Sequence, residues 1–147
     1  MRALGVDLGS KRIGIAVSDD AGSVATPIDV VHRSRDRAGD HRRIVELASE
    51  WEVGTIVVGL PLGLDGSVGR AAQAALDEVE ELRATAGVPV ETYDERLTTV
   101  TAERSLMDMH LNASARRRVV DQVAAAVMLQ AWLDRRRHAS HRPDDAS

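Results

Sequence analysis

Acidic side chains stand at three places in the sequence where their neighbours are apolar or where a strand is expected to end. Asp7 lies in the middle of an apolar predicted strand, and a carboxylate buried there is costly unless it is paired or binds a cation. Asp121 interrupts an apolar face of the last predicted helix, and Asp94 and Glu95 end the last predicted strand. Together these acids predict a site built from three separate elements.

Such a group of carboxylates would bind a hard divalent ion. The sequence has no cysteine, and its five histidines lack the spacing of metal ligands, so oxygen ligands favour Mg²⁺ or Mn²⁺. Two such ions can stabilise the attacking and leaving oxygens when a phosphodiester bond is broken. Simpler roles stay open, because Asp7 can bond the following turn, Asp94 or Glu95 can pair with Arg96, and Asp121 can stabilise its helix.

Arginine clusters could supply the positive charge that phosphate groups need. Of the 19 basic residues all but Lys11 are arginine, although the net charge is −4. The clusters lie at 11–12, 33–43, 116–118 and 135–137, and a planar guanidinium can bind two phosphate oxygens at once. The simpler interpretation of each cluster is a solvated helix face or loop.

Several function classes do not fit the sequence. Gly9 to Gly14 have the spacing of a P-loop, but Ile15 stands where that loop needs lysine. An actin-like ATPase shares the Asp-x-Gly hairpin but needs two domains, whereas 147 residues suit one. Aromatic residues make up 2% of the chain, too few for a platform that stacks bases. The loop from Gly59 to Ser67 could seat an anion at a helix N-terminus or form a tight Asp-Gly turn.

A mixed α/β architecture must position the acids. Apolar alternation predicts three leading strands, after which helical spacing alternates with two short apolar runs. Strands are expected at 2–8, 12–19, 24–32, 55–60 and 88–94, and helices from Asp40 to Gly54, from Ser67 to Gly87, from Thr98 or Thr99 onward, and from Asn112 or Ser114 to about Arg137. This order predicts a five-stranded sheet with a three-strand antiparallel meander, two parallel strands and helices on both faces.

Residue size divides the first two strands into a large and a small face. In the first strand Ala3, Gly5 and Asp7 share one face, so a helix or substrate could approach Asp7 closely. The alanines around Ala125 would let the last helix pack there and bring Asp121 toward Asp7. Residues 1–137 would form one domain and residues 138–147 a disordered tail. With neither a signal-peptide core nor a membrane span, the chain is expected to be cytoplasmic.

Four segments, in order, resemble the motifs of the YqgF/RuvX family. They are VDLGSKRIGIAVSD (6–19), VVGLPLGLDGS (57–67), YDERLTT (93–99) and VDQVAAAVMLQ (120–130), and the match covers nearly the whole chain except the tail. The resemblance implies an RNase H-like fold related to Holliday-junction resolvases. Family members were first described as such resolvases and are now more often regarded as nucleases that mature the 5′ end of pre-16S ribosomal RNA.

The same resemblance implies which residues act. The family's acidic triad falls on Asp7, Glu95 and Asp121, which would be catalytic and would bind Mg²⁺ or Mn²⁺. The residues expected near the phosphates of the nucleic acid are all cationic: Lys11, Arg12, Arg96, Arg117 and Arg118.

The expected substrate is structured RNA, with pre-ribosomal particles as partners and a monomer or homodimer as the active form. Two alternatives stay open: a resolvase that cuts branched DNA, and a nucleic-acid-binding assembly factor without catalytic activity. Phosphate contacts alone do not distinguish them, because they position a substrate without naming it.

Overall fold

The computed structural model describes residues 1–63, 65–97 and 113–140, and for residues 113–122 and 139–140 it describes the backbone only. Its elements, in chain order, are β1 (Ala3–Leu8), β2 (Arg12–Ser18), β3 (Ala25–His32), α1 (Arg37–Glu50), β4 (Thr55–Leu60), α2 (Arg70–Thr85), β5 (Val90–Asp94), the 3₁₀ turn η1 (Glu95–Leu97) and α4 (Ala113–Ser140). The helix expected to begin at Thr98 or Thr99 lies outside the described residues.

The five strands form one mixed sheet in the order β3-β2-β1-β4-β5. β1 pairs antiparallel with β2, which pairs antiparallel with β3, whereas β4 runs parallel to both β1 and β5. This confirms the predicted meander followed by two parallel strands. Pro27 lies in β3 at the edge of the sheet, where its missing N–H costs no central ladder bond.

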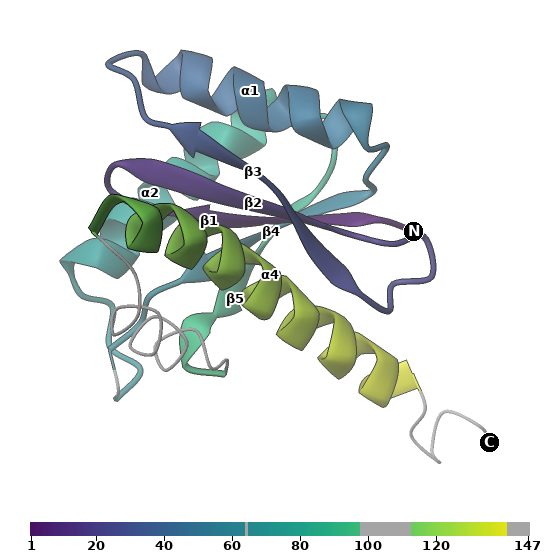
Figure 1. Cartoon of the computed structure of the whole chain (residues 1–147). Helices are drawn as coiled ribbons and strands as arrows, with labels where there is room; N and C mark the ends of the chain where they lie inside the picture. Colours follow the sequence, from purple (N-terminus) through teal and green to yellow (C-terminus); the bar gives the residue numbers. More distant parts are fainter. Residues whose placement is uncertain (64, 98–112, 141–147) are drawn as a thin grey trace.

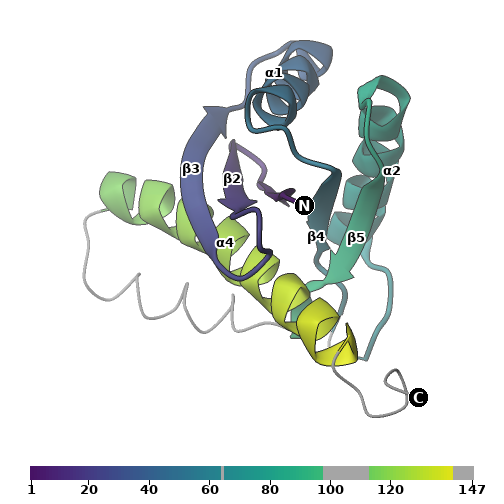
Figure 2. The same ribbon diagram turned by 90° about the vertical axis from the view of Figure 1, so that its right-hand side faces the viewer.

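Helices cover both faces of the sheet, as predicted (Figure 1). The large residues of β1 and β2 face α1 and α2 in one core, around Val6, Ile15 and Val79. The small residues face α4 in a second core, where Ala3 and Ala16 pack with Leu129 and Trp132. Figure 2 shows α4 crossing the sheet on the side opposite α1. Asp7 belongs to the α4 face, because side chains alternate along a strand and Ala3 lies there.

Gly5 explains how closely α4 approaches this face. A Cβ atom at Gly5 would lie 2.8 Å from the Cβ of Leu129 and 3.2 Å from the carbonyl oxygen of Ala125. The helix backbone therefore rests almost directly on β1, which only a strand residue without a side chain permits. The small residues at this contact therefore set the distance between α4 and the sheet.

Two helix starts differ from the sequence predictions. α1 begins earlier than expected, because Asp36 rather than Asp40 is the N-cap and its Oδ1 accepts a hydrogen bond from Gly39 N–H at 3.0 Å. α2 begins after Gly69 without a side-chain cap. Ser67, the expected cap, instead donates its N–H to Asp65 Oδ1 in the preceding turn.

The C-terminal helix is longer than predicted. α4 runs to Ser140, three residues past Arg137, so the first residues of the expected tail are helical; the remainder of that tail, 141–147, lies outside the described residues. Among the helices of the described part of the chain, none has an apolar stretch of the length that a bilayer demands.

Candidate catalytic and metal site

Asp7 is a buried carboxylate with glycines on several sides. Its residue is 5% exposed, and it pairs across β1 and β2 with Gly14. On the other side Val6 pairs with Val58, so continuing that register places Asp7 beside Gly59. Gly5 precedes it on the same face, where Leu129 and Ala125 of α4 cover the strand. We call the surface around Asp7, between Gly14 and Gly59, the clearing. Because Gly14 and Gly59 carry no side chains, the strands on either side of Asp7 present only backbone beside its carboxylate.

Glu95 reaches this clearing from β5, two strands away. It begins η1, directly after β5 ends at Asp94. A Cβ atom at Gly59 would lie 2.7 Å from Oε1 of Glu95 and 3.2 Å from its Cγ. The Glu95 side chain thus lies across the glycine of β4 that is next to Asp7, on the α4 face. Since neighbouring strands are about 4.8 Å apart, the two carboxylates are neighbours in space.

The donor set fits a hard divalent ion. Asp7 and Glu95 offer carboxylate oxygens from different strands, without histidine or cysteine, which is the ligand chemistry of Mg²⁺ and Mn²⁺. Among the side chains that the structure describes, no group of three or more Asp, Glu, His or Cys could hold a metal. The backbone of Asp121 belongs to α4, but its side chain is outside the described residues. Its meeting with Asp7 and Glu95 stays a prediction.

Asp94 has a different role from Glu95. It forms a salt bridge with Arg96, with Arg96 Nη2 at 2.7 Å from Asp94 Oδ2, and also accepts the Arg96 backbone N–H at 2.9 Å. The hydrogen bonds from Arg96 hold the pKa of Asp94 below its usual value, with burial opposing them. The structure thus separates two adjacent acids that the sequence alone left as alternatives: Asp94 closes the turn, and Glu95 faces the clearing.

Arg96 connects this turn to the loop after β4. Gly66 has φ +86°, and a Cβ atom there would lie 3.2 Å from Arg96 Nη1. Gly66 N–H also donates to the Gly63 carbonyl at 2.8 Å, which fits the Asp-Gly turn, one of the two alternatives that the sequence left open for this loop. The predicted phosphate ligand Arg96 is exposed beside this loop, close to where Glu95 enters the clearing.

The remaining predicted cations lie at the turn between β1 and β2 and at the start of α4. Lys11 is exposed and Arg12 half-buried. Both follow Asp7 within one tight turn, because Gly9 N–H donates to the carbonyls of Asp7 at 3.1 Å and Arg12 at 3.0 Å. Arg117 and Arg118 are in α4 by their backbone, and their side chains lie outside the described residues.

A buried ionic network beneath this turn was missed by the sequence analysis. Arg33 donates to both carboxylate oxygens of Glu78, at 2.9 and 2.8 Å, and His41 Nε2 lies 2.7 Å from Glu78 Oε2. Burial would raise the pKa of Glu78, but the hydrogen bonds from Arg33 and His41 outweigh it, so the pKa is lowered. The signal in the sequence was Glu78 itself, an acid on the apolar stripe of α2 beside Ala75 and Val79.

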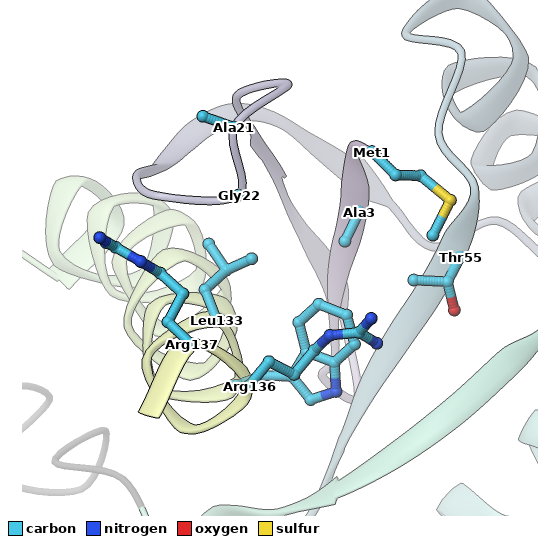
Figure 3. Close-up of a pocket in the computed structure, with 9 residues that line it drawn as sticks. Met1, Ala3, Ala21, Gly22, Thr55, Leu133, Arg136 and Arg137 are labelled. Carbon is cyan, nitrogen blue, oxygen red and sulfur yellow. The ribbon is translucent and has the colours of Figure 1, made fainter. Parts of the chain in front are cut away.

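A separate cavity of about 310 Å³ lies at the opposite end of the strands (Figure 3). It is bounded by Ala3 and Thr55, the first residues of β1 and β4, and by Leu133 and Arg136 of α4. The guanidinium of Arg136 lies 4.6 Å from the centre of the Trp132 ring. No carboxylate is among the described residues that line this cavity, so it lacks the ligands of a metal site and is distinct from the clearing around Asp7.

The chain is similar to several bacterial proteins over nearly its full length. It is 52% identical over 136 residues to a protein of Anaeromyxobacter sp. (strain Fw109-5), covering 92% of this chain and 98% of that protein. It is 46% identical over 145 residues to one of Myxococcus xanthus (strain DK1622), covering 99% and 92% respectively. Both relatives bear the provisional name of pre-16S rRNA nuclease.

Among solved structures, the chain resembles RuvC of T. thermophilus in complex with a Holliday junction substrate. The TM-score is 0.56 at 19% identity, with 93% of this chain and 96% of that chain covered. This likeness shows a shared, RNase H-like fold. The sequence pattern of the family described as "RuvX: Holliday junction resolvase" matches residues 1–135, a range that includes Asp7, Glu95 and Asp121. The chain therefore belongs to the RuvX (YqgF) family of nucleases.

Proposed function

We propose that this protein is a divalent-metal-dependent endonuclease that cleaves a precursor of 16S ribosomal RNA near its 5′ end. The observation that carries the proposal is the placement of Glu95 across Gly59, beside the buried Asp7. The names of the relatives suggest the substrate. The nuclease domain comprises residues 1–137, and the reaction takes place in the cytoplasm, on RNA or on a pre-ribosomal particle.

The chain's own residues would bind and orient the phosphodiester. Asp7, Glu95 and Asp121 would hold one or two Mg²⁺ or Mn²⁺ ions. Such ions, when bound, would stabilise the attacking and leaving oxygens. Lys11, in the turn after β1, and Arg96, in η1 after β5, would contact phosphates flanking the cleaved bond. Arg12, Arg117 and Arg118 would extend this contact, because phosphate neutralisation dominates the affinity for nucleic acid.

Cleavage by three charge-neutralising variants tests the proposal. Asp7→Asn, Glu95→Gln and Asp121→Asn should each lower the rate of RNA cleavage about a hundredfold or more, while circular dichroism and thermal unfolding stay close to those of the wild type. Chelation of divalent ions should abolish cleavage by the wild type, since unneutralised carboxylates repel phosphate. Glu46→Gln is the matched control, because Glu46 is an exposed acid on α1 outside the clearing.

A cleavage assay that compares a 5′ fragment of pre-16S RNA with a four-way DNA junction tests which of them is the substrate. Preferential cleavage of the RNA supports the proposal. The description of the family as Holliday junction resolvase makes branched DNA the second candidate substrate. Cleavage of the junction alone, by a homodimer, would establish this second function. Binding without cleavage of either substrate, equal in wild type and Asp7→Asn, would indicate a non-catalytic assembly factor.

A further inference from the structure

We infer that Arg33 is a positioning residue for the nuclease, held in place by Glu78, and that it fixes the turn from Gly9 to Lys11. The inference deepens the proposed function and rests on it for its catalytic consequence. Its structural part, the bracing of the turn, is independent of any activity.

Arg33 binds the turn at two points. Its Nε donates to the Gly9 carbonyl at 2.7 Å, and its backbone N–H donates to the Lys11 carbonyl at 2.9 Å. Gly9 in turn donates its N–H to the carbonyl of Asp7. A continuous set of hydrogen bonds therefore runs from the Arg33 guanidinium to the backbone of the candidate catalytic aspartate.

The guanidinium is itself fixed from the other side. Its two terminal nitrogens bind both oxygens of Glu78 on α2, and His41 of α1 contacts the same carboxylate. The Glu78 side chain is 7% exposed and that of Arg33 18%. Buried ion pairs of this kind often contribute little net stability, and apolar residues can replace them. A role in positioning explains why a charged pair stands here.

A hollow lies beneath the turn. A cavity of about 230 Å³ lies between the turn and α2, bordered by Gly9, Ser10, Pro61, Ala74 and Glu78. The turn itself is tight, because a Cβ atom at Gly9 would lie 2.5 Å from the Arg12 carbonyl oxygen. Where the turn faces this cavity, the Arg33 side chain and backbone N–H bind its carbonyl groups. Losing the side-chain bond to Gly9 should let the turn move, and with it Lys11 and the end of β1 that carries Asp7.

A double variant separates positioning from stability. Arg33→Met alone would leave Glu78 buried beside an apolar side chain and would destabilise the fold. Arg33→Met combined with Glu78→Gln removes both charges of the pair and leaves an amide to bond His41. It deletes the bond to Gly9 together with the bonds between Arg33 and Glu78 and the ion pair of Glu78 with Arg37. Arg43→Met is the matched control, because Arg43 pairs with Asp29, Glu46 and Glu50 near the protein surface and makes no contact with the turn.

The first readout is amide hydrogen exchange across residues 7–14. In the double variant these amides should exchange about tenfold faster or more, as local opening becomes easier, while amides of β4 keep the rates of the wild type. In Arg43→Met both segments should exchange at wild-type rates. Unchanged exchange at 7–14, or equal acceleration in β4, would overturn the inference and leave Arg33 a stabilising residue only.

The second readout is cleavage of the pre-16S RNA fragment. A displaced turn should lower the turnover rate at saturating RNA about tenfold to a hundredfold, with the dissociation constant for RNA within about twofold of the wild type. A loss confined to affinity would contradict a positioning role. If the wild type cleaves no nucleic acid, the proposed function fails, and the exchange experiment still decides whether Arg33 braces the turn.

Discussion

At the scale of single residues, the clearing around Asp7 depends on a missing side chain. Gly59→Ala would place a Cβ atom 2.7 Å from Glu95 Oε1, so Glu95 must move. The displaced group is the end of a flexible side chain, and the variant should therefore keep its thermal stability. We expect cleavage to fall about tenfold or more, because a carboxylate moved by about an ångström no longer matches the reacting geometry.

A matched glycine makes this result interpretable. Gly87→Ala introduces the same methyl group where nothing lies within 4 Å, and it should cleave RNA like the wild type. Full activity in Gly59→Ala would show that Glu95 need not occupy the position across β4. Isothermal titration with Mn²⁺ on both variants checks the cause, since only Gly59→Ala should bind the ion more weakly.

At the scale of elements, α1, α2 and the end of β3 are joined by the carboxylate of Glu78. Its pKa is lowered from the ordinary value of 4.5, so folding is favoured by ionised Glu78 above that value. This contribution is lost as the pH falls through the lower pKa of the folded state. Urea unfolding between pH 7 and pH 3 should therefore show the wild type losing stability below about pH 4.5.

Glu78→Gln should flatten this part of the profile. At neutral pH the variant should be about 2 kcal/mol less stable, because the amide carries no charge and its single oxygen can accept only one of the two hydrogen bonds from Arg33. The difference from the wild type should shrink as the solution becomes acidic. A constant difference at every pH would mean that the Glu78 charge does not contribute. Glu81→Gln is a suitable control, since Glu81 is largely exposed on the same helix.

The sheet was predictable from the sequence, but the side-chain contacts that join its turns to the helices were not. Alternation of residue size placed Asp7 on the small face, because the alternation of side chains along a strand is a local pattern. Spacing alone left Asp94 and Glu95 as alternatives, and the family resemblance selected Glu95; the structure adds that Asp94 pairs with Arg96. The link from Arg33 to Glu78 joins residues 45 positions apart, a distance at which a single sequence carries no pairing information.

At the scale of the whole molecule, an acidic protein is proposed to bind a polyanion. The net charge is −4, so overall attraction cannot bring RNA to the surface, and local cations must do so. Each phosphate contact makes the logarithm of the binding constant fall more steeply with the logarithm of salt concentration. The number of contacts can therefore be counted from salt dependence.

Lys11→Gln and Arg12→Gln should each reduce the magnitude of that slope by about 0.7 to 0.9 and should weaken binding of all RNA sequences alike. Arg42→Gln should leave the slope unchanged, because Arg42 pairs with Asp36 at the start of α1, away from the clearing. Fluorescence anisotropy with a labelled pre-16S RNA fragment, at several salt concentrations and with Ca²⁺ in place of Mg²⁺, measures binding directly. Equal slopes in all three variants would place the RNA on another face of the molecule and separate the turn at Lys11 from substrate recognition.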